Sequence, residues 1–416
     1  MNFLSKNISI IAGFLIGIII FFIFLISQPV SRINALSSKI ISPLGKSFSV
    51  LSAQDHLYGG NTVYGFLPYW TLQNASYVQW DKITDFAYFS LHINKDGTIR
   101  RILEDNTTDP GYNVWRNKEE LKEIIQKAKD ENVRVALAII SHNDEISTEF
   151  LKCGDTCFQT LKDEIITELN YHNITDINLD FEYVGEVPKE IPDKYTKLTE
   201  YLNSELDKEF GDSKVVVATF ADAFIKQKIT KPQDLVKVVD GLFIMAYDFH
   251  VQTSDKAGPV SPISGRGVKV EYDIESMLGD YLSKVQANKI ILGVAYYGYN
   301  WVVDSKEPYA QRLPGNEIIG FSQSQAYADI METIIKYKPV VLIDPLAQTP
   351  YFNYISSQTG SIRQVHYENV DSLRIKYKLA KSLGLNGVGI WALGYDRGYQ
   401  ELWDLLETEF PRYIYE

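Results

Sequence analysis

The sequence predicts an α/β fold: a (β/α)8 TIM barrel with an inserted α+β lobe between strands seven and eight, preceded by a single transmembrane helix. Eight short apolar runs alternate with amphipathic stretches along most of the chain. Such alternation predicts a parallel sheet, and eight repeats predict closure into a barrel. A doubly wound open sheet is the alternative, but no GxGxxG or P-loop motif follows an early strand.

Composition excludes several classes of function. The 416 residues include 53 acidic and 41 basic side chains, giving a net charge of −12. A phosphate-binding stripe is therefore not expected, and we predict no nucleic-acid partner. Two cysteines and six scattered histidines form no zinc-ligand cluster, so we predict no metal and no cofactor.

The N-terminal segment predicts a membrane anchor. Residues 8–26 read ISIIAGFLIGIIIFFIFLI, without a charge. As a helix they would span about 28 Å, close to the hydrocarbon thickness of a bilayer. A cleaved signal peptide is the alternative, although its apolar region is usually about 7–15 residues long. We assign 1–7 to a tail, 8–27 to the anchor and 28–60 to a Ser-rich stalk.

Charges beside the anchor do not fix its orientation. Lys6 and the terminal amine lie on one side of the segment, and Arg32 and Lys39 lie on the other. The numbers of positive charges are nearly equal, so the positive-inside rule does not give the orientation.

Cys153 and Cys157 lie in the segment CGDTC, where a Gly-Asp turn could bring the two sulfurs together. Pairing would suit an oxidising exterior, and two free thiols are the alternative.

The eight predicted strands are rich in β-branched and aromatic residues and are bounded by polar residues or glycine. They cover 63–70, 84–93, 133–140, 174–183, 214–221, 240–248, 289–298 and 386–394. Helices are predicted at 117–132, 195–210 and 370–383. In the first of these, Leu121, Ile124, Ile125 and Ala128 recur at helical spacing.

The stretch between strands seven and eight predicts the inserted lobe. Residues 299–363 are far too many for a simple βα loop. They contain a helical pattern near 322–337, and a hairpin-like pattern covers 349–367. We expect this lobe to wall one side of the barrel mouth, within a catalytic region that covers 61–416.

The fourth strand carries the most informative pattern. Its polar residues, Asp176, Asn178, Asp180 and Glu182, alternate with Ile177, Leu179 and Phe181. Strand side chains alternate between faces, so the polar row points into the barrel, where ionised carboxylates need partners. Glu182 falls at the C-terminal end, where barrel active sites are built. The alternative is an antiparallel strand with one solvent-exposed face.

This segment resembles the signature of glycoside hydrolase family 18, D-G-x-D-x-D-x-E on the fourth strand of a β/α barrel. Asp180 and Glu182 keep the last two acids, whereas Asn178 replaces the middle acid and Thr175-Asp176 replaces the opening D-G. The N-x-D-F-E form is similar to the branch that contains bacterial spore-germination and cortex-lytic glucosaminidases.

Three further motifs support a chitinase-like resemblance. GLFIMAYDFH resembles the family's M-x-Y-D on strand six and contains Tyr247 and Asp248. ILGVAYYGYNW resembles the strand-seven G-x-x-x-Y-G, with Tyr297 and Trp301, and VGIWALGYD resembles strand eight, with Trp391. Strand three departs from the family, because AIISHN stands where many members have S-x-G-G.

The resemblance implies roles for the polar residues. Glu182 is the expected general acid, and burial beside Asp180 should raise its pKa. No second carboxylate is placed as a nucleophile, and the resemblance implies attack by the substrate's own acetamido oxygen. Asp180 would orient the acetamido nitrogen and Tyr247 its oxygen. Asn178 could hydrogen-bond Asp180 without taking up its proton, and Asp248 would contact sugar hydroxyls.

The aromatic residues of these motifs suggest sugar-binding surfaces. Trp391 would form the floor of the site, and Tyr69, Trp70, Tyr297 and Trp301 are candidate stacking platforms, with plain packing as the alternative. By residue type alone, Met245 is expected in the core, and His142 and His250 are expected to be structural.

Together these features predict a membrane-anchored, retaining glycosidase that cleaves β-1,4 linkages in N-acetylglucosamine-containing glycans, chitin or peptidoglycan. Its location would be the cell membrane, single-pass, with the catalytic domain outside the cytoplasm. One alternative is a non-catalytic, lectin-like barrel, against which the retained Asp180 and Glu182 argue. Another is a structural envelope protein.

Overall fold

The computed structural model describes residues 40–41, 47–48 and 62–412. Strands β1 (Ile40–Ile41) and β2 (Ser47–Phe48) pair antiparallel. The predicted tail and anchor, 1–27, and most of the predicted stalk lie outside the described residues. Among the helices that are described, none combines the length and the apolar character needed to cross a bilayer.

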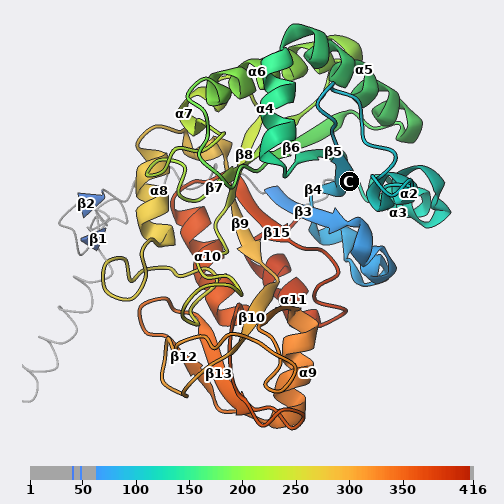
Figure 1. The fold of residues 1–416 in the computed structure, drawn as a ribbon. Helices are drawn as coiled ribbons and strands as arrows, with labels where there is room; N and C mark the ends of the chain where they lie inside the picture. The colour runs from blue at the N-terminus through green and yellow to red at the C-terminus, as the bar shows by residue number, and fades with distance from the viewer. Residues whose placement is uncertain (1–39, 42–46, 49–61, 413–416) are drawn as a thin grey trace, which may run out of the picture. The chain divides into compact units, whose positions relative to one another are not determined.

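Eight parallel strands close into a barrel in the order β15-β3-β4-β5-β6-β7-β8-β9 (Figure 1). They are β3 (Thr62–Pro68), β4 (Asp85–His92), β5 (Arg134–Ser141), β6 (Asp176–Phe181), β7 (Val215–Phe220), β8 (Gly241–Met245), β9 (Ile290–Ala295) and β15 (Gly387–Trp391). The first and last strands of the barrel pair directly, which closes the ring. The predicted (β/α)8 barrel is confirmed.

Helices surround this barrel. They are α2 (Pro110–Asn117), α3 (Glu119–Asp130), α4 (Asp144–Cys153), α5 (Asp155–His172), α6 (Ile191–Phe210), α7 (Pro232–Leu235), α8 (Ile274–Leu282), α10 (Val370–Ser382) and α11 (Gln400–Glu409). Short 3-10 segments lie at Tyr69–Tyr77, Trp80–Lys82 and Ala287–Lys289. The predicted helices correspond to α3, α6 and α10. Helix α6 begins earlier than predicted because Pro192 is accommodated in its first turn.

The inserted lobe forms a second sheet with the strand order β11-β10-β14-β13-β12. Its elements are β10 (Tyr297–Val302), β11 (Gln323–Ala326), α9 (Tyr327–Tyr337), β12 (Val341–Ile343), β13 (Pro350–Ile355) and β14 (Ile362–Tyr367). The lobe, orange in Figure 1, lies beside the barrel next to β9.

The predicted strand over 289–298 contains β9, but its extension beyond Ala295 as the same strand is wrong. The chain leaves the barrel after Ala295 and enters the lobe sheet at Tyr297. At the junction, the Tyr296 backbone N–H donates to the Trp391 carbonyl and the Tyr296 carbonyl accepts from the Tyr327 N–H. The apolar and aromatic run continues through this junction, so the sequence carries no sign of the break.

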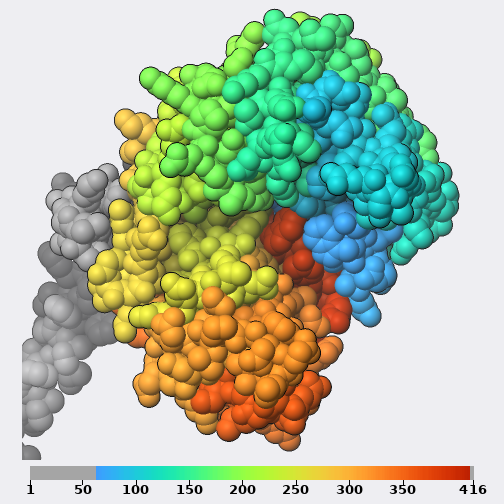
Figure 2. All heavy atoms as spheres, in the orientation of Figure 1, coloured from blue at the N-terminus to red at the C-terminus, as the bar shows by residue number. Residues whose placement is uncertain are grey.

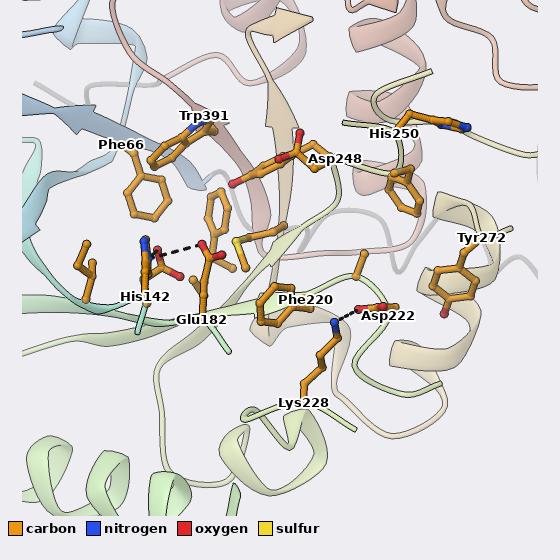
Figure 3. Close-up of a pocket in the computed structure, with 18 of the residues that line it drawn as sticks. Phe66, His142, Glu182, Phe220, Asp222, Lys228, Asp248, His250, Tyr272 and Trp391 are labelled. Carbon is orange, nitrogen blue, oxygen red and sulfur yellow. Dashed lines mark hydrogen bonds and ion pairs between the residues drawn. The ribbon is translucent and has the colours of Figure 1, made fainter. Parts of the chain in front are cut away.

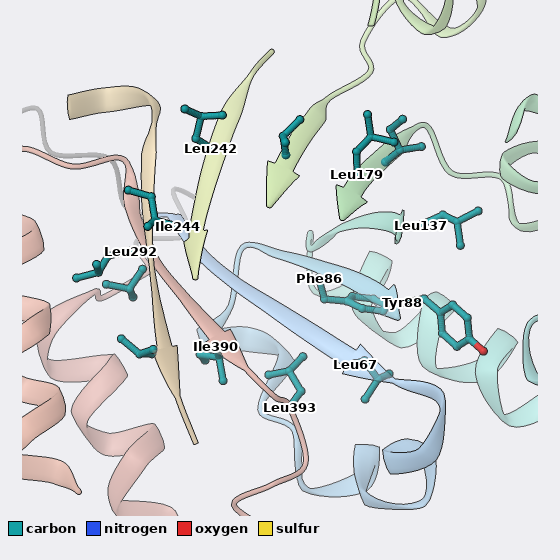
Figure 4. Packing of buried hydrophobic residues seen from close by; sticks show 14 of the residues in the cluster. Leu67, Phe86, Tyr88, Leu137, Leu179, Leu242, Ile244, Leu292, Ile390 and Leu393 are labelled. Carbon is teal, nitrogen blue, oxygen red and sulfur yellow. The ribbon is translucent and has the colours of Figure 1, made fainter. Parts of the chain in front are cut away.

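Most barrel strands pack apolar side chains outward against the helices, and several also pack them inward, whereas the inward face of β6 is polar. Outward-facing residues such as Leu67, Leu137, Leu179 and Leu242 form the large core beneath the helices (Figure 4). A smaller cluster fills the inside of the barrel, and it includes Tyr64, Phe66, Ala87, Phe89, Ala136, Ala138, Ile140, Val216, Phe243 and Ile291. The small alanines of β5 pair in register with Asp176 and Asn178 of β6, which leaves room for the polar row.

The first polar residue of that row is structural. Both carboxylate oxygens of Asp176 accept hydrogen bonds of 2.7 Å from the Arg134 guanidinium. The Lys214 backbone N–H donates to the same carboxylate. Asp176 therefore joins β5, β6 and β7 at the end of the barrel away from Glu182.

The two cysteines form a disulfide bond. Cys153 ends α4 and Cys157 lies in the first turn of α5, and the pair spans the helix junction at Gly154. Gly154 has a φ of 74°, a conformation that glycine adopts without steric cost. Of the two alternatives left open by the sequence, the structure contains the paired form.

Candidate active site

A deep pocket opens at the C-terminal ends of the barrel strands. Its volume is about 1060 Å³, near the upper end of the range usual for small-ligand sites. Figure 2 shows this face hollowed between the upper part of the barrel and the orange lobe, with red atoms from the C-terminal part of the chain within the hollow. This is the end of a β/α barrel at which active sites are built.

Glu182 follows β6 and lies in the pocket with Asp180 and His142 (Figure 3). The His142 Nε2 atom is 3.3 Å from Asp180 Oδ2 and 3.6 Å from Glu182 Oε1. Asp180 is only 4 % exposed, whereas about a third of the Glu182 side chain reaches solvent. Both carboxyl groups line the pocket, and Glu182 is thus the more accessible of the two.

Burial is the largest cause of the shift in the pKa of Glu182, which is raised to about 7. The negative charge of Asp180 raises this pKa further, whereas His142 lowers it. A carboxyl group with such a pKa still carries its proton in a large fraction of molecules at neutral pH. It is therefore suited to general acid catalysis.

Tyr247 and Asp248 follow β8 and line the same pocket. Burial, and then the charge of Asp180, raise the pKa of the Tyr247 hydroxyl well above 10, so it remains a hydrogen-bond donor. Asp248 has a φ of 61°, which aspartate tolerates better than most residues. Its Oδ1 atom accepts hydrogen bonds from the hydroxyls of Tyr297 and of Tyr299, the latter at 2.8 Å.

Aromatic side chains form another part of the pocket wall. Trp391, at the end of β15, lies edge-on to Phe89 at a centroid distance of 4.7 Å and is tilted against Phe66 at 5.5 Å. Tyr69 and Trp70 also line the pocket, and Trp70 is 44 % exposed. Such a surface suits the apolar face of a sugar ring.

A charged wall faces these aromatic residues. Asp222 pairs with Lys228 and with Lys226, each at 3.3 Å. The Lys228 ammonium also lies 4.4 Å from the centroid of the Phe220 ring (Figure 3). The pocket thus combines an aromatic side with a side that offers charged hydrogen-bonding groups.

Three residues predicted to bind substrate do not line this pocket. Asn178 is fully buried inside the barrel, and Trp301 is fully buried in the lobe, where its Nε1 donates to the Val251 carbonyl. Tyr297 is 5 % exposed and reaches the site through its hydrogen bond to Asp248. Trp301 and Tyr297 belong to β10 rather than to a barrel strand, so their side chains pack between the lobe and the segment that follows β8.

The surroundings of Asn178 and Met245 differ from those that the sequence predicts. The predicted hydrogen bond from Asn178 to Asp180 does not form, because neither atom of the Asn178 amide has a hydrogen-bond partner among the described residues. Met245 packs against the core cluster inside the barrel, as predicted, but it is half-buried and also lines the pocket. It is the last residue of β8 and points inward beside Tyr247.

The sequence analysis did not name Asp222, Lys226 or Lys228 of the charged wall, and it assigned His142 a structural place although His142 lines the pocket. Residue type gave no reason to prefer a functional role over a structural one. The sequence does contain a signal for the position of His142. Every second residue of β5 faces inward, namely Ala136, Ala138 and Ile140, and His142 is the next residue in this series. It therefore points into the barrel mouth at the level of Glu182.

His142, Asp180 and Glu182 each offer one atom that could bind a metal ion, and these atoms lie within 4.8 Å of one another. Acidic groups often show such spacing without an ion, and the observed contacts are explained by hydrogen bonding and charge. We assign no metal to them. The absence of a metal and of a cofactor from the reaction stays a prediction.

The mouth of this β/α barrel holds an acid of raised pKa, a second carboxylate and an aromatic wall. Together these features define a glycosidase-like site. Residues 62–396 match the family model described as Glycosyl hydrolases family 18. The chain therefore belongs to glycosyl hydrolase family 18. The predicted enzyme class, a glycosidase, is confirmed.

The similar proteins include bacterial enzymes of spores. A Bacillus subtilis protein named as a putative sporulation-specific glycosylase, YdhD, is 32% identical over 156 residues, which are 38% of this chain and 32% of that protein. The cortical fragment-lytic enzyme of Bacillus subtilis is 25% identical over 353 residues, 82% of this chain and 70% of that enzyme. The predicted resemblance to the cortex-lytic branch is confirmed.

Solved structures show the same fold. The Ostrinia furnacalis Group IV chitinase in complex with allosamidin is 18% identical, with a TM-score of 0.71 over 83% of this chain and 98% of that one. The Bacillus cereus spore cortex-lytic enzyme SleL is 21% identical, with a TM-score of 0.65 over 84% of this chain and 74% of that one.

Proposed function

We propose that this protein is a membrane-anchored glycosidase that hydrolyses β-1,4 linkages in N-acetylglucosamine-containing glycans outside the cytoplasm. The observation that carries the proposal is Glu182, a pocket carboxyl group whose pKa is raised to about 7, beside Asp180. Glycosidic oxygen is a poor leaving group unless it is protonated as the bond breaks. Glu182 is placed to supply that proton.

The geometry of β6 favours a nucleophile from the substrate. Asp180 lies in β6, and Glu182, two residues on, directly follows it and continues the strand pairing, so both carboxyl groups approach a bound sugar from the same side. A protein nucleophile would have to attack opposite the leaving group. We therefore propose that the 2-acetamido oxygen attacks the anomeric carbon, with overall retention of configuration.

The remaining pocket residues fit this mechanism. Asp180 orients the acetamido nitrogen and stabilises the charge of the cyclic oxazolinium ion. The Tyr247 hydroxyl, which keeps its proton, donates to the acetamido oxygen. Trp391 packs against the apolar face of the sugar, and Asp248 accepts hydrogen bonds from sugar hydroxyls.

The similar proteins support the substrate class. Their names include cortical fragment-lytic enzymes and chitinases. We extend this class to the present chain as glycans that contain N-acetylglucosamine, whether chitin or peptidoglycan. A reducing-sugar assay on chitin oligomers and on peptidoglycan compares the two polymers directly.

The substrate class and the cysteines support a location outside the cytoplasm. Polymers of this class lie outside the cytoplasm, and the bond between Cys153 and Cys157 suits an oxidising compartment. We propose that residues 8–27 anchor the protein in the cell membrane as a single span, with the barrel outside the cytoplasm.

Replacing the acid tests the proposed activity. Glu182→Gln keeps the shape of the side chain and removes the transferable proton, so hydrolysis should fall by about 10²–10⁴-fold. Binding of an N-acetylglucosamine oligosaccharide should largely survive. If the wild-type protein and the variant both bind these glycans and neither cleaves them, the protein is a lectin-like barrel instead.

A further inference from the structure

The end of β5 fixes the position of His142. Strand β5 pairs in parallel with β6, and Ser141 lies opposite Phe181. The Glu182 backbone N–H donates to the Ser141 carbonyl at 3.0 Å, which extends this pairing. The next residue of each strand is therefore His142 or Glu182, and the barrel register holds the two side by side.

His142 is the side chain that hydrogen-bonds Asp180. Its Nε2 atom lies 3.3 Å from Asp180 Oδ2, and no other side-chain partner of Asp180 occurs within residues 62–412. The other carboxylate oxygen, Oδ1, is buried without a hydrogen-bond partner in the described structure. The orientation of the Asp180 carboxylate therefore depends on one imidazole.

Asn178 does not share this task. It lies one position inward along the same face of β6, is fully buried, and makes no hydrogen bond through its amide within the described residues. An amide also cannot change its charge as the reaction proceeds. The support that Asp180 receives comes from β5 and not from its own strand.

We infer that His142 is a positioning residue that orients the Asp180 carboxylate and balances the charge that forms on Glu182 during the reaction. This inference rests on the proposed function. When Glu182 gives its proton to the leaving oxygen, the C–O bond breaks and Glu182 becomes an anion. The imidazole, 3.6 Å away, stabilises that anion until attacking water returns a proton to Glu182.

The charged groups around His142 are consistent with this role. Burial lowers the pKa of His142, but the hydrogen bond to Asp180 and the charges of Asp180 and Glu182 outweigh burial, so the pKa is raised. From β4, the His92 ring faces His142 at a centroid distance of 6.4 Å. Burial, and then the charge of Arg100, lower the pKa of His92 to about 4, so His92 is neutral near pH 7.

Two variants of His142 separate its hydrogen bond from its charge. His142→Ala removes both and should lower kcat by about 10- to 100-fold, the scale of a lost hydrogen bond to a charged group, with KM nearly unchanged. His142→Gln retains an N–H donor and should recover part of kcat. In both variants the alkaline limb of kcat/KM should move to higher pH, because His142 lowers the pKa of Glu182.

A double-mutant cycle tests whether His142 acts through Asp180. In an Asp180→Asn background, His142→Ala should cost much less than it costs in the wild-type enzyme. Additive effects, or a His142→Ala enzyme with the kcat and pH profile of the wild type, would overturn the inference.

Nuclear magnetic resonance of the His142 ring gives a readout that needs no activity. Its titration midpoint should fall in the Asp180→Asn variant, in a protein whose thermal unfolding is otherwise intact. An unchanged midpoint refutes the contact between His142 and Asp180 even if no glycan is cleaved. Absence of cleavage by the wild type, with a shifted midpoint, refutes the proposed function and leaves the contact standing.

Discussion

At the scale of single residues, one carboxyl group and its neighbours set the chemistry of the pocket. Burial and the adjacent Asp180 raise the pKa of Glu182, while His142 lowers it, and the result is a value of about 7. A fully exposed glutamate would lose its proton near pH ~4 and could not act as an acid at neutral pH. In the proposed mechanism, the balance among these three side chains therefore decides the working pH.

The first prediction concerns this pH. Glu182 must be protonated to act, so kcat/KM should fall by about tenfold per pH unit as the pH rises above roughly 7. The measurement is a pH profile of kcat/KM on a chitin oligomer, with folding followed by circular dichroism at each pH. A rate that stays constant to about pH 9 would show that another group supplies the proton.

At the scale of elements, the lobe strand β10 completes the site. Tyr297 and Tyr299 point the same way along β10, and both hydroxyls donate to Asp248 after β8. Burial raises the pKa of Asp248, and these two hydrogen bonds oppose that effect. The insertion thus supports a barrel residue through hydrogen bonds, whereas no residue of 299–363 lines the pocket, so the predicted wall at the barrel mouth is not found.

The second prediction follows from this contact. Changing Tyr297 and Tyr299 together to Phe removes both donors and should raise KM several-fold, since Asp248 loses its orientation and a charge-assisted hydrogen bond is worth about 1.5–3 kcal/mol. Tyr351→Phe is the matched control. Tyr351 is also a buried tyrosine of the lobe, and its hydroxyl has no hydrogen-bond partner among the described residues. Steady-state kinetics on one oligosaccharide compares the variants. Equal KM values for all three proteins would show that the lobe does not act through Asp248.

The sequence is informative about elements and less so about their contacts. Alternation along β6 and the end position of Glu182 predict the polar row and its position at the barrel mouth, because strand side chains alternate between faces and the other strands read as parallel. The break at Tyr296 could not be predicted, since apolar residues continue across it. The place of His142 beside Glu182 depends on the register of β5 against β6, which one strand's sequence does not specify.

At the scale of the whole molecule, the chain combines a family 18 barrel with an N-terminal segment whose composition predicts a membrane span. The disulfide between Cys153 and Cys157 closes only a short loop, so its entropic stabilisation, about 2 kcal/mol, is smaller than that of a disulfide across a long loop. Its value as an indicator of compartment is greater than its effect on stability. It agrees with a barrel that works outside the cytoplasm.

The third prediction concerns location. Full-length protein should fractionate with membranes and resist carbonate extraction, because a span of apolar residues is held by the bilayer core. Protease added to intact cells should cut the barrel, and a cytoplasmic marker protein serves as the control. A soluble secreted product that begins near residue ~30 would show that the segment is a cleaved signal peptide.

The stereochemistry of cleavage tests the central claim most directly. The measurement is a proton nuclear magnetic resonance time course of a β-linked N-acetylglucosamine oligomer with the wild-type enzyme, recorded before the anomers equilibrate. Attack by the acetamido group followed by water inverts the anomeric carbon twice, so the first product should be the β anomer. A first product in the α configuration would contradict the roles assigned to Glu182 and Asp180.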